Sequence, residues 1–164
     1  MPEELRIHFV ARAVCSVFPG SAVWEDAMKV LLKREDYDRI LKHARKELPN
    51  EACGLIAGSD KGEVREIKKV YLLTNTDHSS EHFSLDPKEQ LSAVQDMRRL
   101  GLKPLGNWHS HPESPARQSE EDKRLSFDRT ASYMILSLEN REAPVIKSFH
   151  FEEGVSSEEE LAVI

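Results

Sequence analysis

The chain has 164 residues, of which 39% are hydrophobic and 32% charged, and its formal net charge is -6. This length fits one domain with a core of its own, and the acidic balance disfavours a partner held through a phosphate backbone, so we expect no nucleic-acid partner. No uninterrupted apolar stretch approaches the ~20 residues needed to cross a bilayer, so we expect no membrane partner either.

The first 27 residues are the least predictable part of the chain. Their apolar patches, residues 7–10 and 14–18, are separated by charged residues, and their acidic start differs from a secretory signal, so we expect a cytoplasmic protein. Residues 28–32 look like a first strand with a methionine of its own. We therefore interpret residues 1–27 as an N-terminal extension of unknown role. The sequence leaves open whether residues 1–27 are a true extension or an artefact of the start site chosen for translation, and whether they pack on the domain.

Helices and strands alternate in the predicted pattern from residue 28 onward. Residues 34–47 carry apolar side chains at helical spacing, which predicts an amphipathic helix. Pro87 and Gly101 delimit a second helix over 87–100, since proline favours the first turn and glycine follows the last. Strands are predicted at residues 28–32, 51–58, 64–73, 132–138 and 145–151. The pattern favours an α/β fold in which helices flank a mixed β-sheet.

Two histidines lie at strand spacing after a predicted strand that begins near residue 104. Side chains two apart on a strand project to the same face, so His109 and His111 can direct their imidazoles at one ion while Ser110 faces away. The chain has seven histidines, so such a pair also arises by chance at surface or core positions. The pair alone therefore does not establish a metal site.

The segment Ser-Glu-Glu-Asp at residues 119–122 supplies a third ligand type. Ser119 is typical of an N-cap, and the acidic residues after it suit the first turn of a helix. On its own, such a segment is most often a solvated helix start. Here it follows the histidines across a short loop, which brings the Asp122 carboxylate opposite both imidazoles. Three protein ligands leave one position of a tetrahedral zinc open for water, as in catalytic sites.

Glu51 is the candidate general base. It stands at the start of a strongly apolar segment, which is an unusual place for a single acid, because burying an unpaired carboxylate is costly. The alternative is that Glu51 marks an exposed strand start. Cys53 lies two residues further on and could share the face of Glu51, so a Cys–His hydrolase is a second alternative. Only Cys15 and Cys53 occur, and we expect both to be reduced.

The C-terminal segment is strongly acidic. Residues 152–164 are therefore interpreted as a solvated acidic tail, because five glutamates crowd there: Glu152, Glu153, Glu158, Glu159 and Glu160.

Three of these segments together resemble the signature of the JAMM, or MPN+, zinc metallopeptidases. That signature is a glutamate in a Glu-x-Cys-Gly-like strand, then His-Ser/Thr-His-Pro, then a serine and an aspartate three residues apart. Residues 51–54, 109–112 and 119–122 match it, with seven residues between His111 and Ser119. Residues 75–78 and 83–87 also look like prokaryotic members. The resemblance covers roughly residues 28–151, which are interpreted as the metallopeptidase domain.

The resemblance implies an MPN/cytidine-deaminase-like α/β sandwich with the site at a sheet edge. It implies that His109, His111 and Asp122 hold Zn2+, that Glu51 is general base and acid, and that Ser119 helps to stabilise the oxyanion. Similar proteins cleave ubiquitin-like proteins from lysine side chains or trim the C-terminus of a sulfur-carrier protein. The expected partner is thus a ubiquitin-like or sulfur-carrier protein with a flexible Gly-rich C-terminus, which could add a strand near residues 79–84.

Two further readings come from other functional classes. A catalytically silent MPN scaffold, acting as a protein-interaction module, would be expected to have lost ligands, and none of the signature residues is missing here. A non-haem iron oxygenase also uses two histidines and a carboxylate, but this chain alternates helices and strands instead of strands alone. Metal identity and hydrolysis of a ubiquitin-like fusion would separate these readings from the peptidase.

Overall fold

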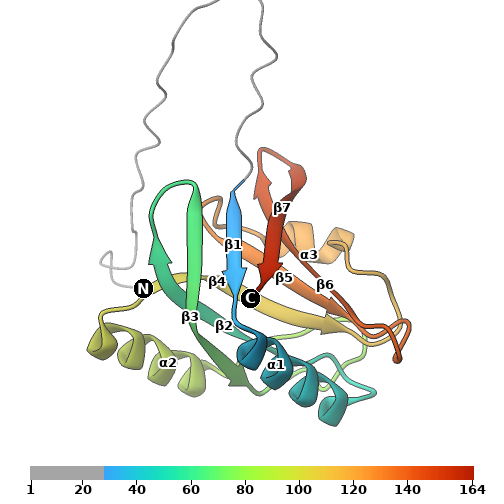
Figure 1. The fold of residues 1–164 in the computed structure, drawn as a ribbon. Coiled ribbons are helices and arrows are strands. Elements are labelled where there is room, and N and C mark those ends of the chain that lie inside the picture. Colours follow the sequence, from blue (N-terminus) through green and yellow to red (C-terminus); the bar gives the residue numbers. More distant parts are fainter. Residues whose placement is uncertain (1–27) are drawn as a thin grey trace, which may run out of the picture.

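Seven strands close into one barrel in the computed structural model, which describes residues 28–164 (Figure 1). The strands are β1 (Lys29–Leu32), β2 (Cys53–Asp60), β3 (Val64–Leu73), β4 (Lys103–His111), β5 (Ser132–Ser137), β6 (Val145–Glu152) and β7 (Val155–Val163). The helices are α1 (Arg34–Glu47), α2 (Pro87–Leu100) and α3 (Glu120–Leu125). The expected N-terminal extension lies outside the described residues. None of these three helices has the length and apolar character needed to cross a membrane.

Both long helices begin and end where the sequence predicts. Helix α2 begins at Pro87 because the Asp86 carboxylate accepts hydrogen bonds from the backbone N–H groups of Lys88 and Glu89. It ends at Gly101, whose φ of 66° is left-handed and costs a glycine little. The local chemistry of the helix ends is therefore sufficient to set these two boundaries.

The strands form a closed sheet, which differs from the expected sandwich. The α/β class is confirmed, and the sheet is mixed, since β1 is parallel to β3 and β7, and β4 is parallel to β5. The expected sandwich of a sheet flanked by helices is confirmed only in part, because the sheet closes on itself and leaves no edge at which the expected site could lie. Strand β7 pairs with both β6 and β1, so the seven strands have no free edge.

Strand β7 lies in the segment expected to be a solvated tail, and that expectation is wrong for most of it. The Glu159 side chain is buried and accepts hydrogen bonds from the hydroxyl groups of Ser132 and Ser148. Leu161 packs against the main apolar cluster. The acidic composition misleads because the buried glutamate is satisfied by hydroxyl donors on the neighbouring strands.

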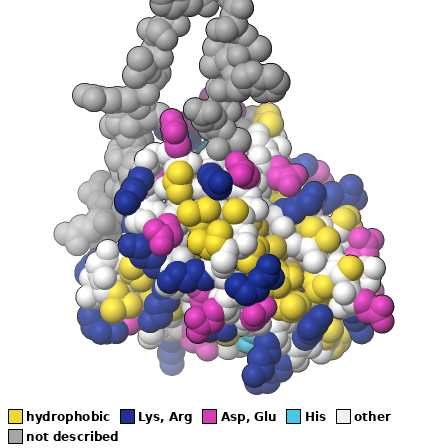
Figure 2. Space-filling view, viewed as in Figure 1, with side chains coloured by type: hydrophobic (Ala, Val, Ile, Leu, Met, Phe, Trp, Pro, Cys, Tyr) yellow, Lys and Arg dark blue, Asp and Glu magenta, His cyan; other side chains and the backbone are white. Residues whose placement is uncertain are grey.

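Charged side chains of both signs are interspersed on the face seen in Figure 2, around apolar side chains near its centre. Two ion pairs attach β7 to its neighbours, Lys29 with Glu160 and Lys147 with Glu158, each at 3.5 Å. All four side chains are well exposed, so each pair contributes at most about 1 kcal/mol. The buried contacts of β7 therefore matter more to its pairing than its surface charges do.

The two long helices cover different faces of β2. Helix α1 contributes Ile40 to the buried cluster that contains Ile56 of β2 and Trp108 of β4. Helix α2 packs Met97 against Ala57, the neighbour of Ile56. Successive side chains of a strand project to opposite faces, so β2 is buried on both sides. This burial explains the continuous apolar run that predicts the strand.

Strand β4 carries the two predicted histidine ligands and pairs with β2 on one side and β5 on the other. A glycine on β2 permits this approach. A Cβ atom at Gly54 would lie 1.8 Å from the Tyr71 carbonyl oxygen and 2.3 Å from Trp108 Nε1. That nitrogen donates a hydrogen bond of 3.0 Å to the Tyr71 carbonyl. The indole of β4 therefore crosses β2 at its glycine and fastens to β3.

Candidate metal centre

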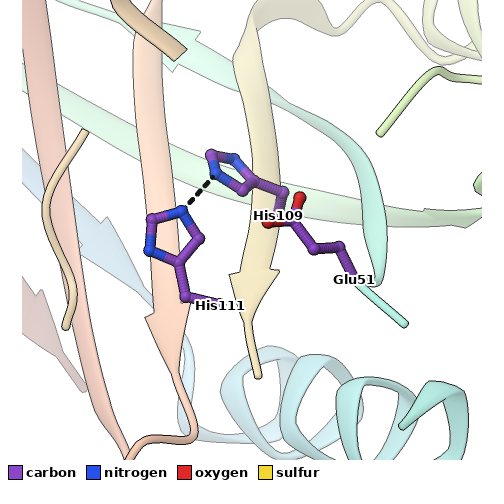
Figure 3. A group of neighbouring side chains, drawn as sticks. All are labelled: Glu51, His109 and His111. Carbon is purple, nitrogen blue, oxygen red and sulfur yellow. Dashed lines mark hydrogen bonds between the residues drawn. The ribbon is translucent and has the colours of Figure 1, made fainter. Parts of the chain in front are cut away.

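Two imidazoles meet at the end of β4 (Figure 3). His109 and His111 are buried, and their Nε2 atoms lie 3.0 Å apart. The residue between them faces the other way, since Ser110 Oγ accepts a hydrogen bond of 2.8 Å from the Ala52 backbone N–H. The predicted alternation along the strand is confirmed. The same hydroxyl ties β4 to the residues that precede β2.

A backbone carbonyl orients the His111 ring. Its Nδ1 lies 2.9 Å from the Pro115 carbonyl oxygen, which can only accept. The hydrogen of the neutral ring is therefore on Nδ1, and the lone pair is on Nε2, the form that binds metals. Burial disfavours the charged ring, but the hydrogen bond with the Asp122 carboxylate is one of several effects that raise the pKa of His111 above its ordinary value.

Helix α3 brings the Asp122 carboxylate to the two histidines. Its Oδ1 lies 3.3 Å from His109 Nε2, and its Oδ2 lies 3.3 Å from His111 Nε2. A capping box sets this position, since Ser119 Oγ accepts from the Asp122 N–H and the Asp122 carboxylate accepts from the Ser119 N–H. Burial alone would raise the pKa of Asp122, but hydrogen bonds with both histidines hold it well below its usual range.

The Glu51 side chain completes the group. It is 3% exposed, so the alternative of an exposed strand start is wrong, and its Oε2 has no hydrogen-bond partner among residues 28–164. Burial raises the pKa of Glu51 to about 8, although the nearby His111 opposes the shift. Glu51, His109 and His111 offer ligand atoms within 4.8 Å of one another. The structure therefore brings the candidate base to the candidate ligands.

The donor set fits a zinc ion. Two imidazole Nε2 atoms and one carboxylate converge at 3.0 to 3.3 Å, and imidazole nitrogen and carboxylate oxygen are ligands that zinc accepts. Both histidines are buried and the Asp122 side chain is 11% exposed, so unneutralised charge is costly there. A fourth group, the Glu51 carboxyl, lies beside the histidines, and its Oε2 has no hydrogen-bond partner within the described part of the chain. This arrangement suits a cation held by three residues next to an acid–base group.

A loop over residues 75–84 covers the site. The Asn75 side chain crosslinks it, donating to the carbonyls of Glu51 and His82 and accepting from the backbone N–H groups of Asp77 and Ser84. The sequence does not predict this role, because a loop asparagine that crosslinks backbone groups cannot be told from one that faces solvent.

The Phe83 ring stacks on the His109 ring, with centroids 4.6 Å apart and planes at 25°. The residue pattern predicts no role for Phe83, although residues 83–87 resemble prokaryotic members of the family. A pocket of about 280 Å³ lies beside this stack, and Phe83, Asn107, Tyr133 and Asp122 are among the residues that line it. The site therefore opens onto a cavity with both aromatic and polar walls.

Cys53 is not placed to act as a nucleophile. The side chain is buried, and its Sγ lies 3.9 Å from the Leu73 carbonyl oxygen. Burial, reinforced by the charge of Glu51, raises the pKa of the Cys53 thiol to about 12. The thiolate is the reactive form, and it is scarce at neutral pH when the pKa is this high. The geometry therefore disfavours the Cys–His alternative.

Comparisons with known proteins agree with the motif. The family described as prokaryotic homologs of the JAB domain matches residues 33–152. The CysO-cysteine peptidase of Mycobacterium tuberculosis is 30% identical over 136 residues, which cover 82% of this chain and 92% of the relative. The desampylase of Haloferax volcanii is 29% identical over 118 residues, covering 69% and 84%. A solved Desulfitobacterium hafniense protein is 50% identical with a TM-score of 0.76, covering 84% and 93%.

Proposed function

The chain belongs to the prokaryotic family of JAB-domain homologs, and from this premise we propose that it is a zinc-dependent peptidase. Its substrate is a ubiquitin-like or sulfur-carrier protein, and the bond hydrolysed is an amide or isopeptide at the C-terminal tail. Two relatives support this substrate class by their names, CysO-cysteine peptidase and desampylase. The structure supports the metal-dependent hydrolysis, because two imidazoles and a carboxylate converge beside Glu51, whose Oε2 has no hydrogen-bond partner among residues 28–164.

Three residues hold the zinc in this proposal, namely His109, His111 and Asp122. Bound there, the ion supplies a Lewis acid that polarises the scissile carbonyl and lowers the pKa of water. The protein orients the ligands in advance. The Pro115 carbonyl sets the His111 tautomer, and the capping box with Ser119 aims the Asp122 carboxylate. Such preparation matters because ligands fixed by their own hydrogen bonds lose little freedom when the metal binds.

Glu51 moves the proton. Its carboxylate takes a proton from the attacking water and delivers it to the departing amine. A general acid and base works best when its pKa lies near the working pH, and burial raises the pKa of Glu51 to about 8. The Oε2 atom has no other hydrogen bond among the described residues, so no partner competes for the proton.

Ser119 stabilises the charge that develops on the substrate carbonyl oxygen. Its Oγ accepts the Asp122 N–H, which occupies a lone pair and leaves the hydroxyl hydrogen to donate. A donor of this kind commonly contributes about 3 kcal/mol to the transition state. Ser119 thus has two roles, since it caps α3 and also contacts the substrate.

The substrate tail is flexible and rich in glycine. Glycine lets a chain lie close to other backbone, which suits approach to a buried site. The loop over residues 79–84 reaches the site from one side, because the Ser79 carbonyl accepts the Glu51 N–H and Phe83 stacks on His109. The tail adds a strand beside this loop and ends in the pocket that His109 and Asp122 line.

The convergence of His109, His111 and Asp122 beside Glu51 is the observation that carries the proposal. The test incubates zinc-loaded protein with ubiquitin-like and sulfur-carrier conjugates and reads the cleavage point by mass spectrometry. Cleavage after the glycine-rich tail, abolished by phenanthroline and spared by a thiol alkylator, is the expected result. Full zinc loading without cleavage of any conjugate would instead favour the catalytically silent scaffold.

A further inference from the structure

We propose that Phe83 is a positioning residue that sets the orientation of the His109 ring, and that Asp77 holds Phe83 in place. This inference rests on the proposed zinc site, because it concerns how one ligand of that site is held. The loop over residues 75–84 thereby has a structural role at the site, although the sequence pattern predicts no role for its aromatic residue, Phe83.

The two histidines are oriented in different ways. Histidine ligands of metals usually donate the hydrogen of the second ring nitrogen to a carbonyl, a carboxylate or a water. His111 follows this rule through the Pro115 carbonyl. The Nδ1 atom of His109 is buried and has no hydrogen-bond partner among residues 28–164. At Nδ1, therefore, no hydrogen bond from the described residues sets the rotation of the His109 ring about its Cβ–Cγ bond, and its Nε2 contacts lie within the candidate site itself.

The Phe83 ring supplies the missing constraint. Its centroid lies 4.6 Å from that of His109, and the planes differ by 25°, a stacked arrangement within the range that aromatic pairs prefer. A flat neighbour at this distance restricts rotation of the imidazole, because turning the ring would drive its edge into the phenyl face. In this orientation His109 Nε2 points at His111 Nε2 and the Asp122 carboxylate.

The Asp77 carboxylate clamps the chain on both sides of Phe83. A single oxygen, Oδ2, lies 3.0 Å from His82 Nδ1 and accepts a hydrogen bond of 2.8 Å from Ser84 Oγ. The hydrogen bonds from His82 and Ser84 also hold the pKa of Asp77 below its usual range, so the acceptor is ionised at neutral pH. Asn75 fastens the backbone at the same two residues. The phenyl ring is thus held by its immediate sequence neighbours.

The test compares Phe83→Leu and Phe83→Tyr with wild type. Leucine keeps an apolar side chain but lacks a flat face, whereas tyrosine keeps the ring. We expect Phe83→Leu and Asp77→Ala to weaken zinc affinity about tenfold or more, the usual effect of losing a group that orients a ligand. Phe83→Tyr should stay within about twofold of wild type. Affinity is measured by competition with a chromogenic chelator, and Co2+ absorption spectra report the ligand geometry.

Phe127→Leu is the matched control, because Phe127 is 85% exposed and makes no ring contact with a described residue. It should bind zinc like wild type. NMR of the metal-free protein gives a readout that needs no zinc, since the Phe83 ring should shift the His109 ring protons upfield and Phe83→Leu should remove the shift. Thermal unfolding identifies any variant that fails to fold.

Wild-type affinity and Co2+ spectra in Phe83→Leu, with the variant folded, would overturn the role of Phe83. Asp77→Ala with an unchanged His109 ring shift would overturn the role of Asp77. If wild-type protein bound no zinc, the proposed function would fail at its first step and this inference with it. Zinc binding in wild type together with an unaffected Phe83→Leu variant would sink only the inference.

Discussion

Glu51 places a carboxyl group in the protein interior without a full set of hydrogen bonds from the described residues, which lowers the stability of the fold. Its carboxyl group is buried, one of its oxygens has no hydrogen-bond partner in residues 28–164, and burial raises its pKa to about 8. An unpaired polar group in the interior lowers stability, so such groups concentrate where chemistry needs them. Its backbone is fixed from both sides by Ser79 and Asn75, which keeps the carboxyl group close to the histidines.

Replacing Glu51 by glutamine separates proton transfer from metal binding. Glu51→Gln keeps the size of the side chain and removes the group that carries the proton, while the three proposed ligands remain. We expect the zinc content to stay at the wild-type level and turnover to fall about 10²- to 10⁴-fold. Metal analysis and a cleavage assay measure the two quantities on the same sample. Retained turnover in this variant would remove Glu51 from the proposed mechanism.

The raised pKa of Glu51 also predicts how stability depends on pH. The pKa rises from 4.5 to about 8 on folding, so the folded protein holds this proton more tightly than the unfolded chain. The resulting stabilisation is complete below pH 4.5 and is lost as the pH rises towards about 8. With a chelator present, the free energy of unfolding of wild type should fall relative to that of Glu51→Gln across this window. If urea unfolding gave the same free-energy difference between wild type and Glu51→Gln at the low and the high end of this pH window, the raised pKa of Glu51 would be contradicted.

Most of the candidate site could be predicted at the residue scale. His109, His111 and Asp122 follow from strand and helix spacing, and the structure brings them together. Phe83 and Asn75 could not be predicted in the same way, because their contacts depend on how a loop folds back over β4. Ring stacking and amide crosslinks leave no periodic pattern along the chain.

At the scale of the elements, the crossing of the Trp108 indole over Gly54, where β4 pairs with β2, is the contact that places the histidines. Gly54 permits this crossing, because a Cβ atom there would overlap the Tyr71 carbonyl and the Trp108 indole. We expect Gly54→Ala to lower the free energy of unfolding by about 3 kcal/mol, the upper range for overpacking a core, since backbone must move. Urea unfolding of the metal-free protein measures the change.

Gly62→Ala is the control for that substitution. Gly62 has a φ of 87° and no heavy atom within 4 Å of an added Cβ, so only backbone strain opposes alanine there. A left-handed residue other than glycine costs about 1–2 kcal/mol. A loss in Gly54→Ala no larger than the loss in Gly62→Ala would show that close packing at Gly54 does not hold β2 and β4 together.

At the scale of the whole molecule, closure of the barrel depends on a polar network inside it. Arg65 of β3 donates to Ser132 of β5, and Ser132 and Ser148 of β6 donate to Glu159 of β7. All four side chains are buried. The network therefore joins β7 to three other strands, including two that are not its neighbours. Closure of the barrel could not be predicted from the sequence, because nothing in the pattern distinguishes the buried Glu159 from the exposed glutamates next to it.

Glu159→Ala should destabilise the protein by about 2 kcal/mol or more, because it leaves two buried hydroxyl groups without their acceptor. Glu158→Ala on the same strand removes a partly exposed ion pair with Lys147 and should cost less than about 1 kcal/mol. Thermal and urea unfolding compare the two variants. Equal losses would contradict the role of the interior network in holding β7.

A zinc ion held at the end of β4 is the central element of the proposed function. Anomalous diffraction at the zinc absorption edge, from crystals of zinc-loaded wild-type protein, locates the ion directly. We predict one peak bounded by Nε2 of His109, Nε2 of His111 and the Asp122 carboxylate, with Glu51 beside it and not among the ligands. A peak elsewhere in the molecule, or no peak in fully loaded protein, would contradict the account.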